Sequence, residues 1–321
     1  MNYKPILIVA GEPYSVFLEI LFKSLKNRNY KKPIILIVSK KLLLMQMKKL
    51  NYSFQLNSLD KTNFNSKKLN NKKLNIIDID FKFKKTFDKI SEKSNFYIEK
   101  SFQVAIEIMK KNGCSGLING PISKKNFLKG KFLGITEYLA RKTNKNNIAM
   151  LIFNKKLSVS PITTHLPLSK VHKNISIKKI VTHVLLVKNF YKKHLKEEPK
   201  IAITGLNPHC ESNFKFSEED KIIIPAIKIL NKKKCKIKGP FPADTVFLKD
   251  ISKKYNVIIG MYHDQVLAPM KTIFNFKAIN ITLGLPFIRI SPDHGPNSSM
   301  LGKNISNPES LIEAIKFLEN K

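Results

Sequence analysis

The sequence has no tryptophan, only three cysteines and only three arginines among its 321 residues. The cysteines, at positions 114, 210 and 235, are odd in number and unpatterned, which indicates a reducing compartment rather than a disulfide framework. No apolar run approaches the roughly 20 residues that a membrane helix needs, and the N-terminus MNYKPILIVAGEP lacks the features of a signal peptide. We therefore expect a cytoplasmic protein with no membrane span.

Acidic residues are also scarce. The sequence has 23 Asp and Glu compared with 58 Lys and Arg, which gives a formal net charge of +35. Nucleic acids and anionic membranes attract such a surface. However, almost all of the excess is lysine spread along the whole chain, whereas nucleic-acid grooves favour the bidentate fork of arginine. No nucleic-acid-binding signature accompanies the charge. We therefore expect a solvated basic surface, with neither nucleic acid nor membrane as a partner.

Glycine is limited to 12 residues, and neither GxGxxG after a strand nor the P-loop pattern GxxxxGK[ST] occurs. Their absence disfavours a standard Rossmann site. It does not exclude a nicotinamide cofactor, because other α/β dehydrogenases bind one without this fingerprint. No cofactor-binding residue is assigned from the sequence.

What the chain does have is an alternation of strand-length apolar runs with amphipathic stretches of helix length, which predicts an α/β fold. Strands are expected at 5–11, 33–39, 74–80, 116–120, 148–153, 157–162, 200–206, 256–262 and 278–284. Helices are expected near 15–27, 40–50, 94–111, 175–194, 217–231 and 307–320. The polar segment at about 52–73 is predicted to be a surface insertion.

Three histidines follow apolar runs in short, proline-flanked or acid-flanked loops: His165 in TTHLPL, His209 in GLNPHCE and His263 in MYHDQ. Ligands gather at the carboxyl ends of strands in α/β sheets, so three imidazoles there could hold a divalent cation and leave positions open for substrate. The alternative is that each is a solvated or hydrogen-bonded loop residue, because no two have local ligand spacing. The histidines in lysine-rich, helix-like stretches are interpreted as structural: His172, His183 and His194.

A candidate anion pocket includes one of the rare arginines. Arg289 lies in NITLGLPFIRISPDHG, just past an expected strand, with Asn280 and Lys271 upstream. An arginine fork, a lysine charge and an asparagine amide together suit a carboxylate or phosphate. Asp264 beside His263 and Asp244 in GPFPADTVF could orient a ligand imidazole or transfer a proton, or could instead be turn or cap residues.

Seven motifs in a fixed order carry a family resemblance: NGPISKKNF (119–127), GITEYLA (134–140), TTHLPL (163–168), GLNPHCE (205–211), GPFPADTVF (239–247), MYHDQVLAPMK (261–271) and NITLGLPFIRISPDHG (280–295). From about residue 5 to the C-terminal helix, the chain resembles the 4-hydroxythreonine-4-phosphate dehydrogenase family of vitamin B6 biosynthesis. The NPH, YHDQ and LGLPFIR signatures are the most specific.

The resemblance implies an isocitrate/isopropylmalate-dehydrogenase-like fold of two α/β/α parts around a cleft. The first domain is expected at 1–125 plus about 285–321, and the second, carrying the metal histidines, at 126–284. It also implies a homodimer with its active site at the subunit interface. Metal binding is carried onto His165, His209 and His263, the third ligand coming from the partner subunit. The resemblance assigns substrate binding to the three residues of the predicted anion pocket, Lys271, Asn280 and Arg289, and also to Thr136.

The implied reaction uses NAD, or NADP, as hydride acceptor and one divalent metal per subunit, Zn, Mg or Co. Oxidation of 4-phosphohydroxy-L-threonine gives a β-keto acid, which loses CO2 to form 3-amino-2-oxopropyl phosphate. The metal would lower the pKa of the substrate hydroxyl and stabilise the enolate. Catalytic roles are expected for the three metal histidines together with Asp244 and Asp264.

Two departures from the family pattern keep alternatives open. Ile135 stands where the family usually has a substrate-contacting histidine, and GEPYSVFLEI replaces a glycine-rich loop, so that Tyr14 and Val16 could reshape the mouth of the cleft. One alternative is a paralogue that oxidises threonate or erythronate 4-phosphate. Another, of a different class, is a non-catalytic basic binding protein with a degenerate site.

Overall fold

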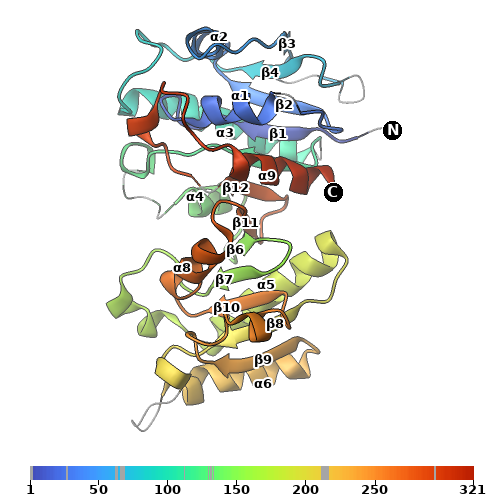
Figure 1. Ribbon diagram of the computed structural model, residues 1–321, viewed down its shortest axis with the longest axis vertical. Coiled ribbons are helices and arrows are strands. Elements are labelled where there is room, and N and C mark those ends of the chain that lie inside the picture. Colours follow the sequence, from blue (N-terminus) through green and yellow to red (C-terminus); the bar gives the residue numbers. More distant parts are fainter. Residues whose placement is uncertain are drawn as a thin grey trace. The chain divides into compact units, whose positions relative to one another are not determined.

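The computed structural model describes residues 3–26, 28–61, 64–65, 69–111, 113–128, 130, 132, 134–210, 217–292 and 294–321. The chain divides into two compact units. The first unit comprises Met1–Asn144 with Pro286–Lys321, and the second comprises Lys145–Leu285. Both combine a sheet with helices, so the predicted α/β class is confirmed (Figure 1).

The sheet of the first unit is entirely parallel, with the order β3-β4-β2-β1-β5-β12. Its inner strands ILIV and IILIV are continuously apolar and buried on both faces, as expected for a parallel sheet between two helix layers. The strands are β1 (Ile6–Val9), β2 (Ile34–Val38), β3 (Leu56–Ser58), β4 (Leu74–Asp78), β5 (Gly116–Asn119) and β12 (Arg289–Pro292).

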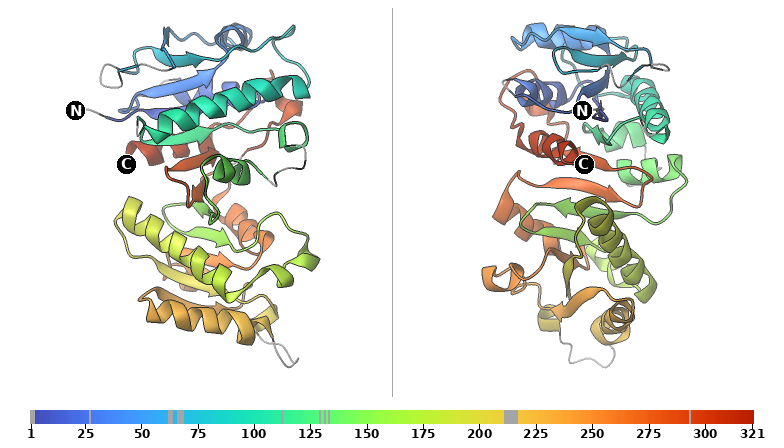
Figure 2. Two further views of the ribbon diagram at one scale, coloured as in Figure 1. Left: turned by 180° about the vertical axis from the view of Figure 1, so that it is seen from behind. Right: turned by 90° about the vertical axis from the view of Figure 1, so that its right-hand side faces the viewer.

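Helices cover both faces of this sheet (Figures 1 and 2). Helix α3 lies on one face, and α1 and α9 lie together on the other. The buried carboxylate of Glu19 in α1 accepts hydrogen bonds from the backbone of Ser306 and Asn304, at 2.6 and 3.1 Å, which ties the C-terminal segment to this helix. The helices are α1 (Phe17–Leu25), α2 (Lys40–Lys49), α3 (Asn95–Lys110), α4 (Ile135–Lys142) and α9 (Glu309–Glu319).

The sheet of the second unit is mixed, with the order β11-β6-β7-β10-β8-β9. Strand β6 pairs antiparallel with β11 and β7, whereas β7, β10, β8 and β9 run parallel. The strands are β6 (Ala149–Phe153), β7 (Ser158–Pro161), β8 (Lys200–Thr204), β9 (Lys236–Phe241), β10 (Val257–Gly260) and β11 (Ile279–Leu283).

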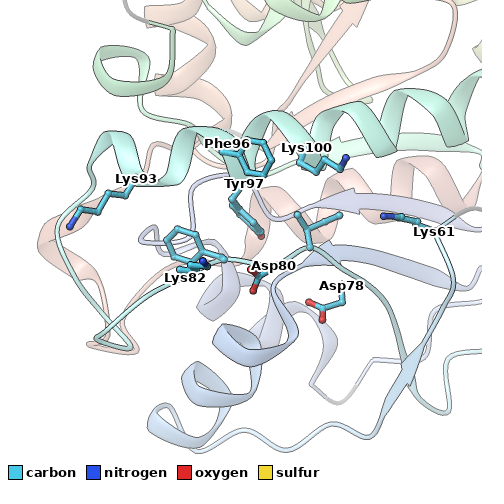
Figure 3. A pocket seen from close by; sticks show the side chains of 10 residues that line it. Lys61, Asp78, Asp80, Lys82, Lys93, Phe96, Tyr97 and Lys100 are labelled. Atoms are coloured by element: carbon cyan, nitrogen blue, oxygen red, sulfur yellow. The ribbon is translucent and has the colours of Figure 1, made fainter.

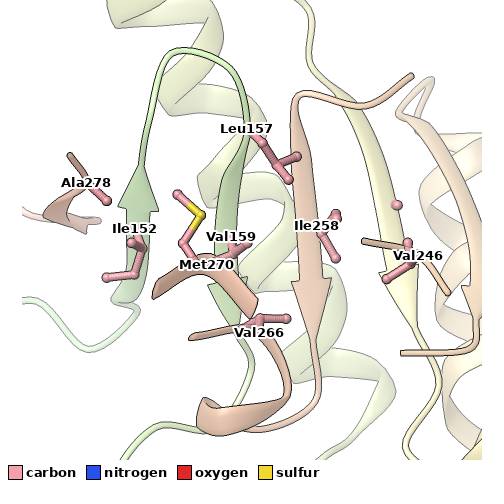
Figure 4. Close-up of a cluster of buried hydrophobic side chains, with 9 residues drawn as sticks. Ile152, Leu157, Val159, Val246, Ile258, Val266, Met270 and Ala278 are labelled. Atoms are coloured by element: carbon pink, nitrogen blue, oxygen red, sulfur yellow. The ribbon is translucent and has the colours of Figure 1, made fainter. Parts of the chain in front are cut away.

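Helices α5 and α6 pack on one face of this second sheet, and α8 packs on the other (Figures 1 and 2). Val266 and Met270 of α8 are buried against Val159 of β7 and Ile258 of β10 (Figure 4). The position of α8 is therefore set by its apolar face. The helices are α5 (Ile177–Phe190), α6 (Ile224–Lys232), α7 (Lys249–Ser252) and α8 (His263–Phe274).

All nine expected strands and all six expected helices are present, with ends shifted by a few residues. Strands β3, β9 and β12 and helices α4, α7 and α8 were not expected. The segment at 52–73 is not wholly an insertion, because Leu56–Ser58 pairs in parallel with β4; positions 62–63 and 66–68 lie outside the described residues. The residues of helix α4 fall in the range 126–284 predicted for the second domain, and they lie in the first unit, where Tyr138 packs on Phe102 of α3.

None of the helices in the described ranges is both long enough and apolar enough to span a membrane.

Candidate active site

Four parallel strands of the second unit bring most of the predicted catalytic residues to one edge of the sheet. His165 follows β7, His263 follows β10, His209 follows β8 and Asp244 follows β9. Because these strands are parallel neighbours in the order β7-β10-β8-β9, their carboxyl ends share an edge. Open α/β sheets bind ligands at this edge.

His165 and His263 come from adjacent strands, and their ring centroids lie 5.9 Å apart. The sequence predicted that His263 lies in a loop. In the structure it is instead the first residue of α8. Its Nδ1 donates to Oδ1 of Asp264 at 2.8 Å, because a carboxylate can only accept. In a neutral imidazole this bond places the lone pair on Nε2, the arrangement in which carboxylates commonly orient metal-binding histidines.

His209 lies in a tightly turned segment after β8, where both His209 and Cys210 have positive φ angles of 57° and 60°. The start of this segment is held by Glu219, whose Oε1 accepts from the backbone of Leu206 and Asn207 at 2.7 and 2.9 Å. Burial raises the pKa of Glu219, but the hydrogen bonds from Asn207 and Leu206 outweigh it and the pKa is lowered. The carboxylate therefore stays charged and holds the turn.

The described residues contain no group of three His, Cys, Asp or Glu side chains that could hold a metal ion. The structure thus brings His165 and His263 together but does not add His209 to them within one chain. Glu211, which belongs to the GLNPHCE motif, lies outside the described residues.

Gln265 is a positioning residue that sequence reasoning missed. It is 8% exposed. Its Oε1 accepts from the backbone of Met261 and from the hydroxyl of Thr204, at 2.7 and 2.8 Å, and its Nε2 donates to the carbonyl of Gly205 at 2.8 Å. One side chain thus ties the end of β10 to the end of β8. The only signal in the sequence was its place in MYHDQ.

Lys271 and Asn280 also belong to the second unit. Lys271 lies on α8, eight residues after His263, and burial lowers the pKa of its ammonium group. Asn280 lies in β11, and its buried Oδ1 has no hydrogen-bond partner among the described residues. A buried amide oxygen of this kind suits a donor supplied by a ligand.

Arg289 and Thr136 lie together in the first unit. Arg289 lies just past β11, as predicted, and is itself the first residue of β12; it is 0% exposed. Its Nη1 donates to Oγ1 of Thr136 at 3.2 Å, and its Nε donates to Oδ1 of Asn119 at 2.7 Å. Burial lowers the pKa of Arg289 to about 10, with Glu137 opposing the shift, so the guanidinium stays charged at neutral pH.

The two departures from the family pattern have different structural consequences. Ile135 is the half-buried first residue of α4, directly before Thr136, so it lies at the predicted substrate site. Tyr14 and Val16, in contrast, are 6% and 0% exposed. Tyr14 packs edge-on against Phe81 at 5.7 Å, so these two side chains fill the core of the first unit rather than reshape an opening.

A hollow of about 660 Å³ lies in the first unit, at the carboxyl end of β4 and beside α3 (Figure 3). Its lining includes four lysines, two aspartates and the exposed ring of Phe96. No predicted site residue lines this hollow.

Comparison with known proteins places the chain in a family. The family model of pyridoxal phosphate biosynthetic protein PdxA matches residues 29–318. The chain belongs to the PdxA family. A protein of Sulfurihydrogenibium sp. named 4-hydroxythreonine-4-phosphate dehydrogenase is 38% identical, with 97% of this chain and 96% of the relative covered.

Two further PdxA-like proteins bear on the substrate and the fold. A protein of Oceanobacillus iheyensis, provisionally named D-threonate 4-phosphate dehydrogenase, is 31% identical over 98% of this chain and 97% of its own length. The crystal structure of 4-hydroxythreonine-4-phosphate dehydrogenase from Klebsiella pneumoniae superposes with a TM-score of 0.85 at 26% identity, covering 99% of this chain and 100% of that one. The predicted family and oxidoreductase class are confirmed.

Proposed function

We propose that this PdxA family member is a 4-hydroxythreonine-4-phosphate dehydrogenase of vitamin B6 biosynthesis. It would oxidise 4-phosphohydroxy-L-threonine with NAD, or NADP, and the resulting β-keto acid would lose CO2 to give 3-amino-2-oxopropyl phosphate. The observation that carries the proposal is the shared edge of β7, β10, β8 and β9, where His165, His263, His209 and Asp244 follow successive strands. The near full-length similarity to a relative of that name supports it.

The donor set fits a divalent metal. Neutral imidazoles suit zinc and cobalt, and Asp264 leaves the Nε2 of His263 available. His165, His209 and His263 would hold the metal, the third ligand coming from the partner subunit of a homodimer. No three such side chains lie together among the described residues of one chain, so this proposal requires the partner's contribution. Once bound, the metal supplies Lewis acidity to the substrate's hydroxyl and carbonyl oxygens.

The remaining residues bind substrate and move a proton. Thr136, Lys271, Asn280 and Arg289 would hold the anionic ends of the substrate and so fix the reacting carbon in position. Asp244 is the candidate acceptor for the hydroxyl proton, because Asp264 already accepts from His263. A cytoplasmic location and a homodimer are parts of the same proposal.

A second candidate substrate is threonate or erythronate 4-phosphate. The apolar Ile135 beside Thr136 favours it, because a charge-assisted contact to the substrate is missing there. The relative named for D-threonate 4-phosphate points the same way. These substrates carry a hydroxyl where phosphohydroxythreonine carries an ammonium group, so the two candidates differ by one charge.

The test is NADH formation by the purified protein, first stripped with a chelator and then resupplied with zinc, magnesium or cobalt. We expect turnover of 4-phosphohydroxy-L-threonine that disappears on stripping and returns with metal. Turnover of threonate or erythronate 4-phosphate alone would establish the second candidate. Loss of metal binding in His165→Ala and His263→Ala, but not in His172→Ala, is the matched check, since His172 lies outside the proposed site.

A further inference from the structure

The hollow beside α3 lies apart from the residues proposed to bind substrate and metal (Figure 3). It opens at the carboxyl end of β4, the edge at which open α/β sheets bind ligands. Strands β2, β1 and β5 lie between β4 and β12, and Arg289 belongs to β12. With about 4.8 Å between neighbouring strands, β4 and β12 are roughly 19 Å apart across the sheet. A ligand in the hollow would therefore not occupy the candidate substrate site.

The charged side chains of the hollow do not pair with one another. They are four lysines and two aspartates: Lys61, Lys82, Lys93, Lys100, Asp78 and Asp80. Within the described part of the chain, the four ammonium groups and the Asp80 carboxylate make no hydrogen bond or ion pair. By contrast, Glu99 on α3 pairs with Lys142 at 3.2 Å. Charges of both signs therefore face a shared space of about 660 Å³ and are available to a ligand.

The hollow also combines an exposed aromatic ring with a buried apolar wall. Phe96, the second residue of α3, is 77% exposed, more than any other large hydrophobic side chain in the described ranges. In the wall, Ile79, Phe81 and Tyr97 are almost fully buried. The rings of Phe81 and Tyr97 pack with their centroids 5.3 Å apart. The wall is therefore firm, and Phe96 leaves a free ring face on which a planar aromatic ligand can stack.

Lys100 is placed to react with a ligand that stacks on Phe96. It follows Phe96 by four residues on α3, so the two side chains lie on the same face of the helix (Figure 3). It is half-buried, whereas the other three lysines of the hollow are exposed. A neutral lysine amine condenses with an aldehyde. Its nitrogen bonds to the carbonyl carbon, the aldehyde oxygen leaves as water with the two amine protons, and an imine forms without any oxidant or reductant.

We propose that this hollow binds pyridoxal phosphate, the end product named in the description of the family. Its aldehyde forms an imine with Lys100, its ring stacks on Phe96, and its protonated ring nitrogen pairs with Asp80. The remaining lysines hold the phosphate. The choice of this aldehyde rests on the proposed function, because the end product of the pathway would then bind the enzyme away from its active site.

The test titrates the full-length protein with pyridoxal phosphate, without substrate or NAD, and follows the absorption band of the imine. Borohydride then reduces the imine to a stable amine, and peptide mapping locates the label. We expect the label to be concentrated on Lys100. Lys100→Arg keeps the charge but cannot form an imine, so this label should disappear. Lys110→Arg is the matched control, because Lys110 is exposed at the end of the same helix and does not line the hollow.

Phe96→Ala tests the stacking contact separately from the imine. Because Phe96 is exposed, the variant should fold normally. We expect its Kd for pyridoxal phosphate to rise roughly fivefold or more, since the aromatic contact is lost. Ile305→Ala, at a 62% exposed apolar position of the same unit, is the control and should leave the Kd within about twofold of wild type. Equal affinities of the two variants would exclude Phe96 as the contact.

Three results would overturn the proposal. A label concentrated on Lys271 would place the aldehyde in the candidate substrate site. A label spread over the exposed lysines would show an unspecific reaction of a basic surface. Inorganic phosphate that binds as tightly as pyridoxal phosphate would show that the hollow selects charge alone. All of these measurements are made without turnover, so failure to oxidise 4-phosphohydroxy-L-threonine would refute the proposed function and leave this inference to be decided by the label.

Discussion

Single polar side chains hold the candidate site in place in both units. In the second unit, Gln265 joins the ends of β10 and β8, and Glu219 holds the segment that leads to His209. In the first unit, Asn119 holds Arg289. None of these three residues carries out chemistry in the proposed reaction. Each is recognisable only from its partners in space, which lie up to 170 residues away in the sequence.

Ile135 is the residue whose substitution we expect to change the preference between the two candidate substrates. Replacing it with histidine would place a polar donor beside Thr136 at the start of α4. A charge-assisted hydrogen bond to substrate is typically worth about 1.5–3 kcal/mol. We therefore expect Ile135→His to raise kcat/KM for 4-phosphohydroxy-L-threonine by roughly 10-fold or more, since 1.4 kcal/mol corresponds to a factor of 10.

The measurement is steady-state kinetics of Ile135→His on both 4-phosphohydroxy-L-threonine and threonate 4-phosphate. Ile135→Leu serves as the control, because it changes shape without adding a donor. An unchanged ratio of kcat/KM between the two substrates in Ile135→His would show that this position does not set specificity.

At the scale of elements, α8 shows how packing overrides local sequence signals. The stretch contains Pro269, which removes a backbone donor and costs a helix interior about 3 kcal/mol. The sequence predicted a loop at His263 and no helix over 263–274. The helix forms because Val266 and Met270 are buried against the sheet (Figure 4). Similarly, β12 has only four residues and exists as a strand by pairing with β5.

The buried face of α8 sets the position of this helix. Replacing a large side chain on that face with a small one should therefore displace the site residues on α8 and also lower the stability of the protein. Met270 is 1% exposed, and Met270→Ala is expected to lower the free energy of unfolding by about 2–5 kcal/mol. His263 begins the same helix, so metal affinity should fall too. Urea unfolding and metal titration of the same samples measure both effects.

The control is Ile273→Ala on the same helix, where the side chain is 47% exposed and a small change in stability is expected. Full stability of Met270→Ala would contradict the role assigned to this face.

At the scale of the whole molecule, each unit contains a buried titratable group whose pKa is far from its ordinary value. In the second unit, burial and the nearby Lys179 lower the pKa of His183 from 6.5 to about 3. Because the folded state keeps this imidazole neutral, the stability of the folded state that depends on neutral His183 is fully present above pH 6.5 and is lost as the pH falls toward 3. In the first unit, burial raises the pKa of Glu12 to about 7. Hydrogen bonds from the Ser94 side chain and the Tyr14 backbone lower this pKa but only partly offset the effect of burial. These two groups should therefore make stability depend on pH in opposite directions.

Glu12 binds a proton in the folded state between pH 4.5 and about 7, where the unfolded chain has released it. Its contribution to stability is therefore complete below pH 4.5 and is lost as the pH rises through 7, by an amount on the order of 3 kcal/mol. We expect Glu12→Gln to match wild type more closely at pH 4.5 and to gain stability relative to it at pH 8. Urea unfolding at the two pH values measures this difference.

Glu107→Gln, an exposed position on α3, is the control and should show no such dependence. A difference between Glu12→Gln and wild type that is the same at both pH values would refute the assignment to Glu12.

The sequence by itself determined the α/β class, the expected strands and helices, and the residue types of the candidate site. It could do so because apolar periodicity reports which residues are buried, and because histidine, arginine and glycine are scarce enough here to mark motifs. Only the tertiary structure decided that His165 and His263 are adjacent, that His263 begins a helix, and that Arg289 is buried and donates to Thr136. The physical reason is that strand order and long-range packing bring these residues together, and neither leaves a local pattern in the chain.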